Sequence, residues 1–131
     1  MRSVLDKLGV SAKYNGYHML KMAVQMAVED EDRLTNIARS IYPTLAQKFH
    51  TDTKGVYKSI GRAVNAFWLY GNRELYDEIS GYHVEEKPNN KEFITTLATY
   101  ALRHPSKEER EAARGAVASA DRSARESTEN I

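Results

Sequence analysis

The chain has 131 residues, of which 41% are hydrophobic and 28% are charged, and its net charge is only +1. These proportions are typical of one globular domain with a hydrophobic core, and the near-neutral charge excludes a uniformly basic nucleic-acid-binding chain. Cysteine is absent, which excludes disulfides, thiolate metal sites and thiol nucleophiles. No apolar run approaches the ~20 residues of a membrane span and no secretory signal is present, so we expect a cytoplasmic protein without membrane contact.

Hydrophobic spacing predicts an all-α fold of about six helices around one core, with no β wing. A short helix over residues 3–8 and a loop over 11–16 lead to a longer helix over 17–29. We interpret the four acids at 29–32 as the start of the next helix, where the helix dipole favours negative charge, rather than as a cation site. That third helix ends before Pro43 and has one apolar face, made of Leu34, Ile37, Ala38 and Ile41.

The centre of the chain predicts two helices with a tight break between them. Pro43 suits the first turn of a helix, so the first of the pair covers residues 43–49. Thr51 or Asp52 can cap the second helix, which runs from residue 53 to residue 70 and ends at Gly71. Its apolar stripe consists of Val56, Ile60, Ala63, Val64 and Phe67. We expect Trp68 and Tyr70, near its end, to pack against neighbouring helices.

The opposite face of this second helix is basic. It carries Lys54, Lys58, Gly61, Arg62 and Asn65, with Tyr57 on its flank. Residues 43–72 contain four cationic residues and one acid, a local net charge of +3. A short helix, a brief turn and a longer helix with a basic outer face are typical of a helix-turn-helix, in which the second helix enters the major groove. The alternative is an ordinary helical hairpin with solvated lysines.

The remaining chain predicts a helix over residues 72–79, a loop over 82–90 and a last amphipathic helix over 93–102. Residues 1–104 therefore form the expected helical domain. Residues 105–131 have few large apolar side chains and alternating charges, which indicates a charged tail, either frayed helix or disordered. A partner-binding helix is the alternative for this tail.

Sequence signals for catalysis are absent. The chain contains no HExxH, GxxxxGK or GxSxG motif, and its four histidines lie in different predicted elements. We therefore expect no enzymatic activity, no metal site and no cofactor.

Several segments together resemble a known family. They are LDKLGVSAKYNGYHMLKMAV, LTNIARSIYPTLAQKF, IGRAVNAFWLYGN and GYHV…KPNNKEFI, with the distinctive patterns YPxxAxxF, WxxGN and KPxNxEF. Through residues 3–103 the chain resembles the C-terminal effector domain of the stage-zero sporulation response regulator of Firmicutes. The resemblance implies a helical DNA-binding domain that is monomeric in solution and pairs on short boxes of the TGTCGAA type. It also implies contact with RNA polymerase and its sigma factor.

Carried over position by position, the resemblance places five residues on the groove-facing side of the second helix: Lys54, Tyr57, Lys58, Gly61 and Arg62. Among them we expect Lys54, Lys58 and Arg62 at the groove and its phosphates and Tyr57 at a base or sugar edge. We expect Lys48, Thr51 and Thr53 to contact the DNA backbone. Residues 72–90 correspond to the region that the family uses for polymerase contact, and the charges there either serve this contact or form a solvated helix face: Arg73, Glu74, Asp77 and Glu78.

Two departures from the family bear on function. Gly55 and Tyr57 stand where the family has an arginine and a glutamate, so we expect similar docking on a different DNA box. The family also carries a receiver domain before this module. Here the chain is either a fragment or a stand-alone homologue, and its Met-Arg-Ser start favours the second. Two functions remain open: a sequence-specific transcriptional regulator, or a protein-interaction module that binds a sigma factor or a full-length homologue without reading DNA.

Overall fold

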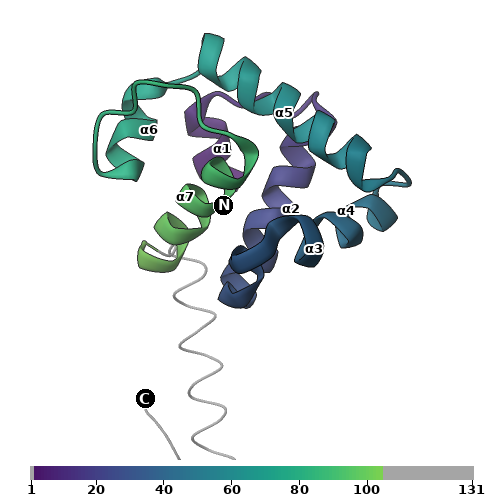
Figure 1. The fold of residues 1–131 in the computed structure, drawn as a ribbon. Helices are drawn as coiled ribbons and strands as arrows, with labels where there is room; N and C mark the ends of the chain where they lie inside the picture. Colours follow the sequence, from purple (N-terminus) through teal and green to yellow (C-terminus); the bar gives the residue numbers. More distant parts are fainter. Residues whose placement is uncertain (1, 105–131) are drawn as a thin grey trace, which may run out of the picture.

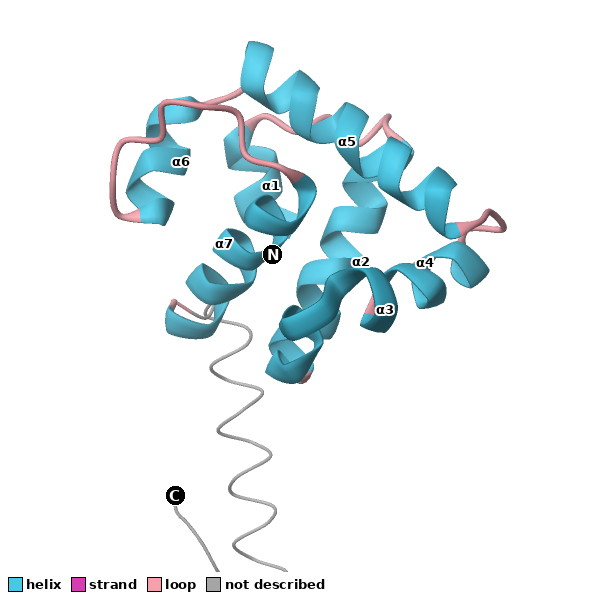
Figure 2. Cartoon of the chain, in the orientation of Figure 1, coloured by secondary structure: helices cyan, strands magenta, loops and turns pink. Residues whose placement is uncertain are grey.

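The computed structural model describes residues 2–104, and the predicted tail at 105–131 lies outside them. Within this range the chain forms seven α-helices and one 3-10 helix, η1, and no strand, which confirms the predicted all-α fold (Figures 1 and 2). The elements are α1 (Arg2–Leu8), α2 (Asn15–Glu29), η1 (Glu31–Asn36), α3 (Ile37–Ser40), α4 (Tyr42–Lys48), α5 (Thr53–Tyr70), α6 (Arg73–Ser80) and α7 (Asn90–Arg103).

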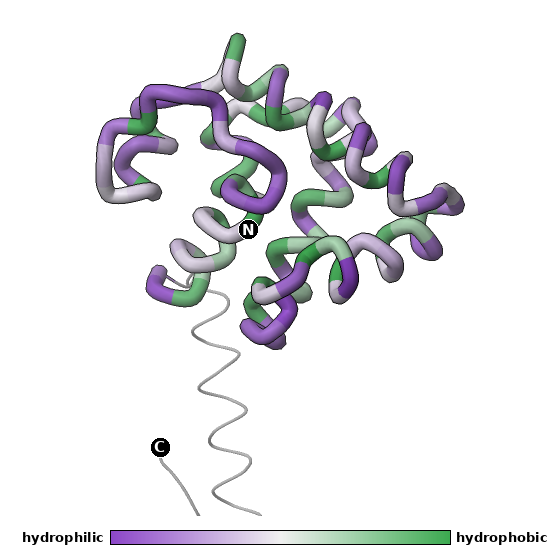
Figure 3. Tube along the Cα trace, in the orientation of Figure 1, coloured by the Kyte–Doolittle hydropathy of each residue, from purple (hydrophilic) through white to green (hydrophobic). Residues whose placement is uncertain are grey.

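The core lies between α2, α5 and α7, and α4 closes it beside the start of α5 (Figure 1). Three aromatic rings fill one end of it: Phe67, Tyr76 and Phe93, from α5, α6 and α7, lie with their centroids 5.3 Å apart in each pair. Hydrophilic and hydrophobic positions alternate along α5, as an amphipathic helix requires (Figure 3). The core therefore covers one face of α5 and leaves the other to solvent.

Helices α2 and α5 approach each other very closely at Gly16. A Cβ atom placed on Gly16 would overlap the backbone oxygen of Ser59 and lie 2.8 Å from Cβ of Ala63. Only glycine allows two helix backbones to lie this close. Gly16 was expected in a loop, but the helix begins at Asn15, so this glycine lies in the first turn of α2.

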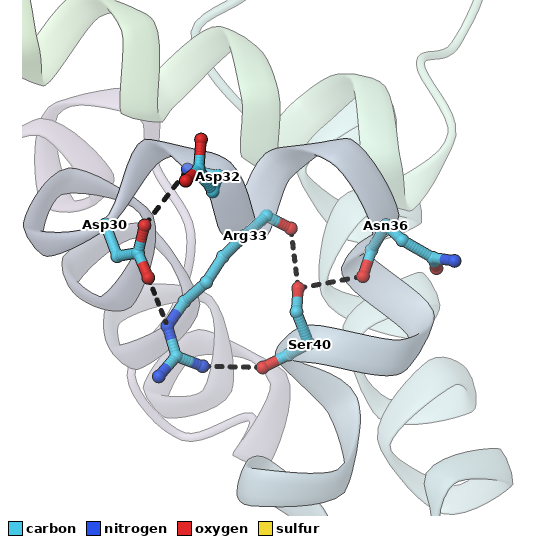
Figure 4. Close-up of polar contacts among 5 residues, drawn as sticks. All are labelled: Asp30, Asp32, Arg33, Asn36 and Ser40. Atoms are coloured by element: carbon cyan, nitrogen blue, oxygen red, sulfur yellow. Dashed lines mark hydrogen bonds and ion pairs between the residues drawn. The ribbon is translucent and has the colours of Figure 1, made fainter.

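The chain between α2 and α4 differs from the single third helix that the sequence predicts. The backbone of Asn36 leaves helical geometry (φ −147°, ψ 84°), which separates η1 from the one-turn helix α3, and its side-chain oxygen accepts a hydrogen bond from the N–H of Arg39. Arg33 donates to the backbone oxygen of Ser40 (2.6 Å), and the Ser40 hydroxyl donates back to that of Arg33 (2.6 Å; Figure 4). A short side chain that can bond the local backbone competes with the helix, and at Asn36 it interrupts one.

The loop from α6 to α7 is tied to α6 by Asp77. One carboxylate oxygen accepts the Val84 N–H (2.9 Å) and the other accepts Nδ1 of His83 (2.8 Å). The hydrogen bond from Val84, and after it that from His83, holds the pKa of Asp77 below its usual value of 3.8. At the far end of the loop, Asn89 and Glu92 form a capping box, so α7 begins at Asn90, three residues before its predicted start.

We predict opposite effects for two glycine-to-alanine substitutions. Gly16→Ala places a methyl group against the Ser59 backbone and should destabilise the fold by about 1–3 kcal/mol. Gly61→Ala has room, since its Cβ would meet only Asn90 at 3.8 Å, and should stabilise α5 by up to about 1 kcal/mol. Urea unfolding of both variants tests this pair. A Gly16→Ala protein as stable as the wild type would show that the helices do not approach this closely.

A second prediction concerns acid stability. Because the folded-state pKa of Asp77 is lowered, its contribution to stability is present above its unfolded pKa and is lost as pH falls through the folded one. Asp77→Asn should therefore show a smaller fall in Tm than the wild type between about pH 5 and about pH 3. Glu78→Gln, which neutralises the next residue on α6, serves as the control. Equal falls in the wild type and Asp77→Asn would contradict the role of this carboxylate.

Candidate nucleic-acid interface

The turn between α4 and α5 has a defined hydrogen-bond pattern. The N–H of Thr51 donates to the carbonyl of Ala46 (2.9 Å), and that of His50 to Gln47 (3.4 Å), while His50 has a φ of 56°. This combination is a Schellman motif, in which the left-handed residue is most often glycine. Of the two predicted caps, Asp52 is the one that acts: its carboxylate accepts the N–H of Gly55 at 2.7 Å. Hydrogen bonds therefore fix the turn at both ends, at the C-terminus of α4 and at the N-cap of α5.

The rotation of α5 about its axis is fixed by its inner face. All five predicted stripe residues are buried: Val56, Ile60, Ala63, Val64 and Phe67. Lys54, Lys58 and Arg62, which lie away from this stripe, are exposed. The helix has 18 residues and contains no acidic side chain, so its outer face presents only positive charge. The predicted basic face is thus present on the surface.

The structure brings the eight predicted DNA-binding residues onto one continuous segment, formed by the end of α4, the turn and the first ten residues of α5. All except Gly61 are exposed, and Gly61 is half-buried. Tyr57 has 61% of its surface exposed. Figure 1 shows α5 along one edge of the molecule with α4 meeting it through the short turn. This arrangement is that of a helix-turn-helix, in which the outer face of the second helix is free to enter a groove.

Two contacts to α5 were not visible in the sequence. Asn90, only 8% exposed, donates from Nδ2 to the backbone oxygen of Tyr57 (3.0 Å), which lies 33 residues earlier in the chain. Lys87 in the preceding loop lies 3.4 Å from Oδ1 of Asn65. Burial raises the pKa of the Tyr42 hydroxyl, and a hydrogen bond with Asn90 offsets part of that rise. The start of α7 thus supports the N-terminal half of α5. The sequence predicted residues 82–90 only as a loop and did not indicate this contact with Tyr57.

The four residues assigned to polymerase contact lie on α6 in different environments. The guanidinium of Arg73 stacks 3.5 Å from the centre of the Trp68 ring, so Trp68 packs as predicted. Asp77 is engaged with the loop, whereas Glu74 and Glu78 are exposed. Tyr70 does not pack as predicted: it is 85% exposed, because it is the last residue of α5 and the chain then turns away at Gly71.

No group of three histidine or carboxylate side chains in residues 2–104 lies in an arrangement that could hold a metal ion. No helix in the same range has the length and apolar character needed to cross a membrane.

A comparison with protein families supports the resemblance read from the sequence. Residues 1–101 match the family model described as sporulation initiation factor Spo0A C terminal. The match covers well over half of the chain. It includes the helix pair α4 and α5, the start of α2 and the start of α7. The chain therefore belongs to the Spo0A C-terminal family, the DNA-binding effector domain of a sporulation regulator.

Proposed function

We propose that the protein is a sequence-specific transcriptional regulator that reads the major groove with the N-terminal half of α5. The observation that carries this proposal is that the outer face of α5 has no acidic side chain. The Asp52 cap, at the end of the turn after α4, fixes where this helix begins. A helix of this width fills the major groove, which is about 12 Å across. A basic face there gains affinity from the phosphates whatever the sequence, and specificity from the few side chains that reach base edges.

Each residue of the helix pair has a position that suits a role. Lys54 and Lys58, one turn apart at the start of α5, point to solvent and are the proposed base-edge contacts, since the first turns of a recognition helix enter the groove deepest. Lys48, Thr51 and Thr53 surround the turn and are the proposed contacts to the DNA backbone. Figure 3 shows this turn as a continuous hydrophilic stretch.

Tyr57 and Gly55 distinguish this chain from the family pattern. The backbone of Tyr57 is held by Asn90 while its ring is largely exposed, so the ring is presented to a base or sugar edge from a fixed point. Gly55 lies against the side chains of Thr51 and Asp52, and a longer side chain there would displace the Thr51 hydroxyl. These two positions support docking like that of the family on a DNA box with different bases.

Contact with RNA polymerase is proposed for α6. Because Asp77 is already bonded to the loop, the direct contacts fall to the exposed acids Glu74 and Glu78, with Arg73 held against Trp68. Exposed acids suit a partner that presents a basic surface. Pairing of two copies on DNA, as the family resemblance implies, is part of the same proposal.

The central test is a selection from a random DNA library at near-physiological salt. The wild type should enrich one motif, and Lys58→Ala should weaken binding to it by about 1–3 kcal/mol while relaxing the preference at one base position. Arg103→Ala, which removes a charge at the far end of α7, is the control and should enrich the same motif equally. No enrichment by folded wild-type protein would instead favour the interaction module that binds a sigma factor or a homologue.

The role of Tyr57 has its own test, the change Tyr57→Glu. A carboxylate at this position accepts a hydrogen bond from the amino group of cytosine, so the preference at one base position should move to cytosine while the rest of the motif stays. Tyr82→Glu is the control, because it changes a comparably exposed tyrosine in the loop between α6 and α7. This variant should select the same motif as the wild type. An unchanged motif in Tyr57→Glu would remove this residue from base reading.

A further inference from the structure

A small hollow lies beside the outer face of α5, where the start of α2 passes its middle. Its volume is about 200 Å³, and it is lined by Lys13, Tyr14, Asn15, Gly16, Ser59 and Arg62. The close approach of Gly16 to Ser59 creates it, because this contact brings the chain just before α2 against the middle of α5. Figure 2 shows the loop before α2 running past α5.

The charge of this hollow is wholly positive. No acid is among its lining residues, in contrast to the larger hollow beside the α6–α7 loop, whose lining includes Glu85, Glu86 and Glu92. Lys13 and Arg62 are both exposed, and within residues 2–104 neither forms a salt bridge. The Lys13 ammonium lies 5.8 Å from the centre of the Tyr14 ring, and Nη2 of Arg62 lies 3.4 Å from the Ser59 hydroxyl. Two cations and a hydroxyl therefore share one site that has no internal anion.

We propose that this hollow binds one phosphate of the DNA backbone through Lys13, Arg62 and Ser59, and that Arg62 therefore holds a strand rather than reads a base. The inference rests on the proposed function of α5. Arg62 follows Lys58 by four residues, so it lies one turn further along the outer face, on the flank next to α2. When a helix fills the major groove, the sugar-phosphate strands run along its two flanks.

The chemistry of the three side chains suits a phosphate. An arginine fork can donate two hydrogen bonds to phosphate oxygens, a lysine adds a mobile charge, and a serine hydroxyl donates a third hydrogen bond. A contact of this kind fixes the register of α5 along the groove without carrying sequence information.

Lys13→Gln is the test, because Lys13 is exposed and lies outside the helix pair. Affinity for a random-sequence duplex is measured over a range of salt concentrations for the wild type, Lys13→Gln and the control Arg103→Gln. Loss of one phosphate contact should reduce the log–log salt slope by about 0.9 and the affinity at physiological salt about fivefold. Arg103→Gln should match the wild type. The motif selected by Lys13→Gln should be that of the wild type, since a phosphate contact is blind to sequence.

The outcomes separate this inference from the proposed function. A wild-type salt slope in Lys13→Gln, with Lys58→Ala still impaired, overturns the phosphate site and leaves α5 as the reading helix. Absence of duplex binding by the wild type overturns both. Titration with inorganic phosphate alone distinguishes the source of the anion. If phosphate binding depends on Lys13 while the salt slope for DNA is the same in Lys13→Gln and the wild type, the hollow binds a free phosphate and its role on the DNA strand is overturned.

Discussion

The close crossing of α2 over α5 at Gly16 is the contact on which the rest of the arrangement depends. Because Gly16 has no side chain, the two helix backbones meet at Ser59, and the apolar stripe of α5 is pressed into the core. The same contact brings Lys13 beside Arg62. A second glycine contact acts at the end of the helix, where a Cβ on Gly71 would lie 2.5 Å from the backbone oxygen of Leu8. With Asp52 capping its start, α5 is held at its beginning, middle and end, so its outer side chains project from a backbone in a fixed position.

Charge is distributed unevenly over a chain whose net charge is close to zero. The helix pair and the loop before α2 present lysine and arginine, while exposed acids lie on α6 and on the loop after it. A uniformly basic protein would bind any polyanion and repel basic partners. A divided surface instead orients the protein as it approaches DNA, because the field attracts one face and not the others.

Local patterns in the sequence were sufficient for most of the fold. The stripe of α5, the start of α4 at its proline and the stop of α6 at Gly81 each depend on residues within one or two turns of each other. The features that were missed depend on distant or competing contacts. Asn36 interrupts a helix because its side chain bonds the backbone. Gly16 is needed because the backbone of Ser59 lies against it, and Asn90 donates a hydrogen bond to Tyr57, which lies 33 residues earlier. The apolar stripe was enough to predict which residues face outward on α5. The hollow at Lys13 could not be predicted, because it depends on where α2 lies relative to α5.

The contacts that hold α5 in place leave the side chains of Lys54, Tyr57 and Lys58 exposed. Asn90 binds the backbone oxygen of Tyr57 and not its ring, Asp52 binds the backbone N–H of Gly55, and the core contacts only the stripe. The atoms that stabilise α5 are therefore different from the exposed side-chain atoms proposed to contact DNA. The ring of Tyr57 is largely exposed, so exchanging this side chain should change stability by less than about 0.5 kcal/mol. Position 55 is different, because a Cβ atom there would meet the Thr51 hydroxyl beside the Asp52 cap.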